Sequence, residues 1–363
     1  MNMKIRPQLL QPTKSYANHT PPLKAGMLDC SLGVNPYGCP QAAVEALQQF
    51  DWTRLSDYPH DHSLTEALCR YWQGTGLTAE EITLTDASIA ALYHINQLFA
   101  APEAEVVGFA PSFTDMVVNV NMAGMRYVQV PLEGASCRED PEALLAAVSD
   151  KTVMLYLDNP NNPTGQTLPP ETVEHLVAEA GKRGVCVLVD EAYGDFLPED
   201  QSVLQCWGKY DNLIVTRTFS KGFGLAGLRA GYIITGQELI RYISKVSNPY
   251  MMSELSRELA AAALSDRSYA DSHGADFAAM KQALRDVCGG ALSMAVTDDR
   301  VPICLLQHRD PRADLQELLM AQGVLTCSGG EFEPLDRSSV RLRVPRAEDM
   351  EKLLQAVEKV NNG

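Results

Sequence analysis

The sequence lacks the features that direct a chain to a membrane, a metal or an oxidising compartment. No run approaches the roughly 18 apolar residues that a membrane-spanning helix needs, and the first residues, MNMKIRPQLLQPTKSY, contain no continuous apolar segment of a signal peptide. The nine cysteines form no C-x-x-C pair, and none stands at zinc-ligand spacing with a histidine. We therefore expect a cytoplasmic protein with reduced thiols and no metal site.

Positive charge is also scarce. The 30 lysines and arginines stand against 46 acidic residues, which gives a formal net charge of −16, and no basic stripe with interleaved aromatic residues is present. Nucleic acids and anionic membrane surfaces repel a chain of this balance, so we expect neither as a partner. An anionic substrate would have to be bound by a few well-placed arginines.

The chain of 363 residues is long enough for one large and one smaller domain. From about residue 62 to 265, short apolar strands alternate with helical segments. This alternation predicts an α/β fold with a mainly parallel sheet covered on both faces by helices. The predicted strands are residues 82–85, 106–109, 127–130, 153–157, 185–189, 213–215 and 230–234.

Beyond about residue 270 the pattern changes to that of a smaller α+β domain, with strands expected at 303–306 and 340–344. We assign residues 1–50 to an N-terminal arm and part of the small domain. Residues 51–265 form the predicted large domain, and residues 266–363 the predicted C-terminal small domain.

The stretch 215–231, VTRTFSKGFGLAGLRAG, contains one lysine among hydroxyl, small and apolar residues. Such surroundings lower the pKa of Lys221 and favour the neutral amine that attacks a carbonyl. Thr218, Ser220 and Arg229 suit a phosphate dianion. The GFGLAG segment also matches a dinucleotide-binding loop, but no acidic residue follows at the required distance. A surface lysine in a glycine-rich turn is the other alternative.

Polar residues follow two further apolar strands. NPNNPTG places Asn162 after one of them, and DEAY places Asp190 and Tyr193 after the other. Each segment alone could be a turn, a helix cap or part of the core. Together they meet at one sheet edge, where parallel sheets bind ligands. They match the needs of pyridoxal 5′-phosphate, whose aldehyde suits Lys221, whose ring nitrogen suits Asp190, and whose phenolate oxygen suits Asn162 and Tyr193.

The set NPNNPTG, DEAY and SKGFGLAGLRAG resembles the fold type I, class I/II aminotransferases. Within that family it is similar to the group of histidinol-phosphate aminotransferases and threonine-phosphate decarboxylases, over about residues 27–360. The resemblance implies an enzyme that transfers an amino group from an amino acid to a 2-oxo acid, aldehyde or ketone through a Schiff base on Lys221. Lys221, Asp190 and Tyr193 are the implied catalytic residues.

The resemblance implies further contacts. Ser88 and Ile89, in the loop that begins at Asp86, would contact the cofactor phosphate, and Phe113 would stack on its ring. Relatives usually have glycine where Asp86 stands, and we expect its side chain to point away or to cap the helix. Tyr58 would reach the phosphate of the other subunit, which implies a homodimer with shared sites. Arg341 would hold the substrate carboxylate, with Asn35 also at the substrate.

The substrate and the reaction are left open. Relatives that act on phosphorylated substrates typically carry an arginine where this chain has Cys327. Arg343, which should share a strand face with Arg341, or Arg337 could compensate, or both could be surface charges. The segment 29–40 resembles the decarboxylases, so an amino-acid decarboxylase is the alternative to an aminotransferase. A cofactor-binding regulatory or interaction module without turnover is the third hypothesis.

Overall fold

Seven strands form the central sheet of the protein, in the order β2-β8-β7-β6-β5-β3-β4. The structure is a computed structural model that describes residues 4–10 and 21–363. The strands of this sheet are β2 (Ile82–Thr85), β3 (Glu105–Ala110), β4 (Arg126–Pro131), β5 (Thr152–Asp158), β6 (Cys186–Asp190), β7 (Leu213–Thr218) and β8 (Gly231–Thr235).

The sheet is mainly parallel, as predicted. β4, β3, β5, β6 and β7 run in one direction, and only β8 is antiparallel to its neighbours β7 and β2. The predicted strand at 82–85 coincides with β2. An apolar run does not encode strand direction, so the reversal of β8 was not visible in the sequence.

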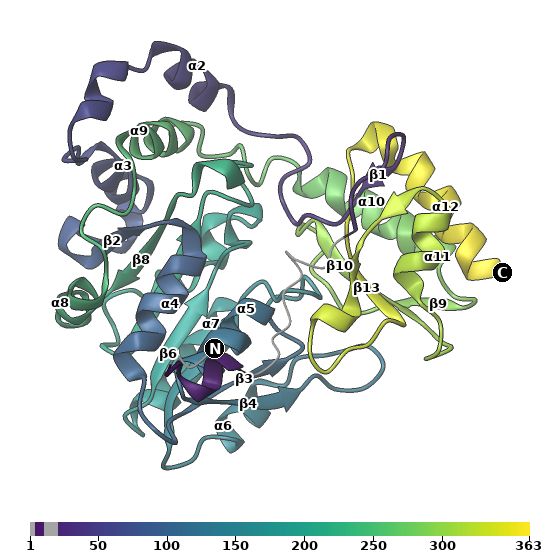
Figure 1. The fold of residues 1–363 in the computed structure, drawn as a ribbon, viewed down its shortest axis with the longest axis horizontal. Coiled ribbons are helices and arrows are strands. Elements are labelled where there is room, and N and C mark those ends of the chain that lie inside the picture. The colour runs from purple at the N-terminus through teal and green to yellow at the C-terminus, as the bar shows by residue number, and fades with distance from the viewer. Residues whose placement is uncertain (1–3, 11–20) are drawn as a thin grey trace.

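Helices cover both faces of the sheet, as Figure 1 shows. In β6, Val187 and Val189 pack into the core on one face, while Cys186 and Leu188 pack into the core on the other. Every residue of β6 is buried, which explains its unbroken apolar sequence. The helices over one face are α4 (Ala87–Phe99), α5 (Thr114–Met122) and α8 (Gln237–Val246); those over the other are α2 (Gln41–Gln49), α3 (Ser63–Tyr71), α6 (Pro141–Ala146), α7 (Pro170–Gly181) and α9 (Glu254–Ala263).

A separate antiparallel sheet with its own core forms the second unit, at the right of Figure 1. Its strand order is β12-β13-β10-β9. The elements of this unit are β9 (Leu292–Met294), β10 (Ile303–His308), β12 (Cys327–Ser328), β13 (Ser339–Arg343), α10 (Gly274–Val287), α11 (Leu315–Ala321) and α12 (Met350–Asn362).

The N-terminal segment connects the two units. Strand β1 (Leu28–Asp29) pairs in parallel with β11 (Val324–Leu325) beside the small sheet, whereas α2 packs against α9 on the large sheet. Residues 1–3 and 11–20 of the predicted arm lie outside the described residues. In the described part of the chain, no helix has the length and apolar character to cross a bilayer.

Candidate active site

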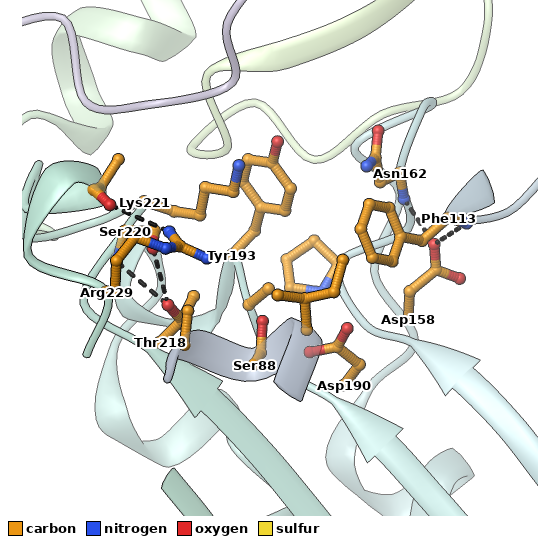
Figure 2. A pocket seen from close by; sticks show the side chains of 15 residues that line it. Ser88, Phe113, Asp158, Asn162, Asp190, Tyr193, Thr218, Ser220, Lys221 and Arg229 are labelled. Atoms are coloured by element: carbon orange, nitrogen blue, oxygen red, sulfur yellow. Dashed lines mark hydrogen bonds between the residues drawn. The ribbon is translucent and has the colours of Figure 1, made fainter. Parts of the chain in front are cut away.

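A pocket opens where β5, β6 and β7 end, at the sheet edge predicted from the sequence. Asp158, Asp190 and Thr218, the last residues of these strands, all line it. In Figure 2 the amine of Lys221 lies beside the Tyr193 ring, between Arg229 on one side and Phe113 on the other. Of the eleven residues predicted to contact the cofactor, the pocket gathers ten, from five segments of the chain: Ser88, Ile89, Phe113, Asn162, Asp190, Tyr193, Thr218, Ser220, Lys221 and Arg229.

Lys221 follows β7 in a loop, and its amino nitrogen lies 5.5 Å from the centroid of the Tyr193 ring. Burial lowers the pKa of Lys221 to about 8, helped by the positive charges of Arg341 and Arg229 and opposed by Asp190. A sizeable fraction of the amine is therefore neutral near neutral pH, as a nucleophile requires.

Asp190 is buried below the lysine. Its Oδ1 accepts a hydrogen bond of 2.9 Å from the hydroxyl of Thr216, and its Oδ2 lies 3.5 Å from the hydroxyl of Tyr156. Burial raises the pKa of Asp190 to about 6, against the lowering effect of the Thr216 hydrogen bond and of Lys221. At neutral pH this carboxyl is mostly ionised and suits a protonated ring nitrogen.

A buried arginine braces the segment that carries Asp190 and Tyr193. The Nε of Arg217 donates to Glu191 at 2.8 Å, and its NH1 donates to Asp195 at 2.6 Å. The guanidinium also lies 4.5 Å from the Trp72 ring centroid. Removing Arg217 would leave the buried carboxylates of Glu191 and Asp195 without their positively charged partner, which should lower the free energy of unfolding by roughly 3–5 kcal/mol.

The end of the pocket near Arg229 offers several donors to an anion. The Thr218 hydroxyl lies 2.9 Å from that of Ser220, and Ser88 and Ile89 stand in the first turn of α4, where backbone N–H groups are unpaired. Arg229 is exposed and has a left-handed backbone, with φ of 54°.

Asp86 holds the N-cap position of α4, but its side chain accepts no hydrogen bond from the helix. Of the two expected arrangements, the helix cap is therefore absent. Burial raises the pKa of Asp86, while the charge of Arg229 and then that of His94 lower it. The charge of Arg229 thus acts on Asp86 at this end of the pocket.

Arg341 reaches the pocket wall from β13 of the small sheet. Its NH1 donates to Oδ1 of Asn162 at 3.0 Å, and its NH2 donates to the Ser31 carbonyl at 2.7 Å. Asn35, also predicted at the substrate, fastens the N-terminal segment to the lysine loop: its N–H donates to the Lys221 carbonyl at 3.0 Å, and its Nδ2 to the Gly222 carbonyl at 2.9 Å.

Two predicted residues lie away from this pocket. Arg343 donates its guanidinium hydrogen bonds to the backbone carbonyls of Leu32, Val344 and Asp29, so it ties the N-terminal segment to β13. Tyr58 is 69% exposed and stacks on Tyr250 at 4.6 Å between ring centroids.

Other lining residues were not predicted as site residues. Asp158 is the most polar of them; Ala87 and Pro160 also line the pocket. Asp158 directly follows the apolar run 153–157 at the end of β5, so the argument from strand ends could have found it. Ala87 carries no chemical signal in its side chain, although its backbone is left-handed, with φ of 61°.

Comparison with known proteins shows the family to which the sequence belongs. The model of the family "Aminotransferase class I and II" matches residues 25–358. A histidinol-phosphate aminotransferase of Desulfitobacterium hafniense (strain Y51) is 33% identical over 331 residues, 89% of each chain.

Two solved structures share the fold. A histidinol-phosphate aminotransferase from Sinorhizobium meliloti, in complex with pyridoxal-5′-phosphate, has a TM-score of 0.82 at 24% identity and covers 99% of this chain and 98% of its own. An L-threonine-O-3-phosphate decarboxylase from Porphyromonas gingivalis has a TM-score of 0.77 at 20% identity, with 93% and 100% covered. The match along nearly the whole sequence shows that the chain belongs to the class I and II aminotransferases and is a pyridoxal-phosphate-dependent enzyme that acts on amino acids and oxo acids.

Proposed function

We propose that Lys221, Asp190 and Tyr193 carry the transamination chemistry of this chain. The donor set of the pocket fits pyridoxal 5′-phosphate, because it combines an amine of lowered pKa, a buried carboxylate, hydroxyl groups and an open helix N-terminus. The residues proposed to hold the cofactor are Ser88, Ile89, Phe113, Asn162, Asp190, Tyr193, Thr218, Ser220, Lys221, Arg229 and, from a second copy of the chain, Tyr58.

When bound, pyridoxal phosphate supplies an aldehyde for the substrate amine and a protonated ring that withdraws electrons from the substrate Cα. Asp190 keeps the proton on the ring nitrogen, because an ionised carboxylate stabilises that positive charge. The neutral amine of Lys221 accepts the proton from the substrate Cα and delivers it to the carbon that was the aldehyde carbon of the cofactor. Arg341 holds the substrate carboxylate so that the Cα–H faces Lys221.

The observation that carries the proposal is that Arg341 lies close to both Lys221 and Asn162. Its charge is the second-largest cause of the lowered pKa of Lys221, after burial, and its NH1 is bonded to Asn162. A carboxylate bound by this guanidinium would thus lie beside the reactive amine.

The immediate neighbours of Arg341 favour a carboxylate over a phosphate dianion at this place. Its cross-strand partners are Cys327 on β12 and Leu305 on β10, and residues directly opposite in an antiparallel pair share a face. Neither adds a second positive charge. We therefore propose an amino acid substrate without a phosphate group, although the relatives are named for histidinol phosphate.

The test is a product assay on the cofactor-loaded enzyme with a panel of amino acids, histidinol phosphate and a 2-oxo acid acceptor. We expect an amino acid donor to yield its 2-oxo acid and an equal amount of newly aminated acceptor. Release of CO₂ without a 2-oxo acid would instead show a decarboxylase. Preference for histidinol phosphate would refute the proposed substrate class.

Arg341→Leu should lower kcat/KM for the best amino acid about a hundredfold or more, because a charge-assisted bidentate contact is lost. The matched control is Arg337→Leu, since Arg337 is an exposed arginine that pairs with Asp314 at 3.4 Å. It should leave kcat/KM unchanged. Equal losses in the two variants would exclude Arg341 as the carboxylate ligand.

We also propose that two copies of the chain form a homodimer. Tyr58, Trp52, Leu55 and Tyr250 are large side chains that are each at least 42% exposed, and they belong to two segments that meet where Tyr58 stacks on Tyr250. An exposed apolar cluster of this kind favours association with another protein surface.

A further inference from the structure

Two segments that line the pocket both donate hydrogen bonds to one buried carboxylate, that of Asp158. Its Oδ1 accepts hydrogen bonds from the Ser112 hydroxyl (2.9 Å) and from Nδ2 of Asn161 (3.1 Å). Its Oδ2 accepts from the backbone N–H groups of Phe113 (3.1 Å) and Asn162 (2.9 Å). An ionised carboxylate offers about four lone-pair positions, so these four donors fill its acceptor capacity.

The four donors come from two segments that are distant in sequence. Ser112 and Phe113 lie between β3 and α5, whereas Asn161 and Asn162 follow β5. In Figure 2 Asp158 lies beneath both Phe113 and Asn162 and is bonded to each. The carboxylate therefore fixes the backbone of Phe113 relative to that of Asn162, together with the hydrogen bond of 3.2 Å from Nδ2 of Asn161 to the Pro111 carbonyl.

We propose that Asp158 is a positioning residue that holds Phe113 and Asn162 at the separation which pyridoxal phosphate requires. It acts through these two residues and not by contact with the reacting atoms. The inference rests on the proposed places of Phe113 and Asn162 beside the cofactor.

The electrostatic surroundings of Asp158 argue against a role in simple turn formation. In the sheet register Asp158 is the direct neighbour of Asp190, and buried Glu139 and Tyr156 lie near it as well. A charge buried beside a second carboxylate is costly, and such arrangements are concentrated at functional sites. The convergence of four donors from two segments offsets this cost.

The test measures binding of pyridoxal phosphate to the apoprotein by fluorescence titration, with the visible circular dichroism of the bound cofactor as a second readout. Asp158→Ala should weaken binding about tenfold or more, because buried donors lose their acceptor, and should change the dichroism per bound cofactor. Asp158→Asn should restore most of the affinity, since its amide oxygen can still accept from the N–H groups of Phe113 and Asn162.

The matched control is Glu139→Gln, which replaces a buried acid that is near Asp158 but is not among the residues that line the pocket. Burial, with the charge of Asp158, holds the pKa of Glu139 well above its usual range, and glutamine replaces this carboxyl with a neutral group of nearly the same shape. Affinity and dichroism should stay as in the parent. A loss equal to that of Asp158→Ala would show general damage and overturn the proposal.

A double-mutant cycle with Asn162→Ala tests the coupling. Asn162→Ala should cost much less affinity in the Asp158→Ala background than in the parent; additive effects would overturn the proposal. If Asn162→Ala alone leaves affinity unchanged, the proposed place of Asn162 is wrong, and the same cycle with Phe113→Leu then decides the role of Asp158. If Asp158→Ala does not fold, Asp158→Ser replaces it, because one hydroxyl cannot bridge both segments.

Discussion

Lys221 and Asp190 share one pocket that moves their pKa values toward each other. Burial lowers the pKa of Lys221 to about 8 and raises that of Asp190 to about 6. The desolvation that opposes charge on both groups is partly offset by their mutual attraction. The charges of Arg341 and Arg229 also lower the pKa of the lysine, which is the direction that frees its lone pair.

The pH dependence of cofactor uptake should follow the lysine. Because only the neutral amine attacks an aldehyde, the rate of covalent attachment to the apoprotein should rise with pH and level off above about pH 8. Stopped-flow absorbance gives this rate, and butylamine measured in parallel corrects for titration of the cofactor.

Arg341→Leu removes a nearby positive charge and should shift the midpoint of this profile to higher pH. Arg337→Leu should not shift it, because that side chain is exposed at the surface. A profile that is flat between about pH 6 and 9 in the parent would contradict the lowered pKa of Lys221.

At the scale of elements, the N-terminal segment links the small sheet to the lysine loop. Its Ser31 carbonyl accepts from Arg341, and its Asn35 is bonded to the backbone of the lysine loop. Gly38 then packs so tightly on Gly224 that a Cβ at Gly224 would lie 1.8 Å from the Gly38 carbonyl oxygen. Movement of this segment would thus displace Arg341 and Lys221 together.

Substitution of Gly224 by alanine tests this contact. Gly224 has φ of +63°, so alanine would bring both backbone strain and the clash with Gly38. We expect a clear loss of unfolding free energy in urea and a raised KM for the substrate. Gly208→Ala is the control, because Gly208 has φ of +80° but nothing within 4 Å of an added Cβ.

The control should lose only the strain energy, about 1–2 kcal/mol, and keep its KM. If the two variants lose the same stability and both keep the parental KM, the N-terminal segment does not position the site.

At the scale of the whole molecule, the end of the pocket that contains Arg229 is open to solvent in a single copy. Arg229 is exposed there, and Tyr58 lies on the same chain's surface, outside its own pocket. A homodimer in which each Tyr58 completes the partner site accounts for both observations.

Mixed dimers should show whether the sites are shared. Lys221→Ala and Tyr58→Ala should each be nearly inactive, but co-expression with two affinity tags should yield hybrids with one intact site. An equal mixture should recover about a quarter of the parental activity, because half of the dimers are hybrids with one working site of two. No recovery in purified hybrids would refute a shared site, and sedimentation analysis checks that they are dimers.

Local patterns in the sequence were sufficient to predict much of the fold. The fully apolar run 185–189 predicted a strand buried on both faces, and the polar residues that follow the apolar runs of β5, β6 and β7 predicted the edge of the sheet that holds the pocket. These features follow from burial and from the geometry of parallel sheets, which depend on residue type and order alone.

The direction of long side chains was decided only by the tertiary structure. The two-residue period of a strand places Arg341 and Arg343 on the same face, yet Arg341 reaches Asn162 while Arg343 binds carbonyls of the N-terminal segment. The four donors on Asp158 likewise come from segments some 50 residues apart. The sequence by itself determined which chemistry is present and at which sheet edge, because each strand carries its own polar end. The pairing of those groups depends on contacts between distant segments, which exist only in the folded chain.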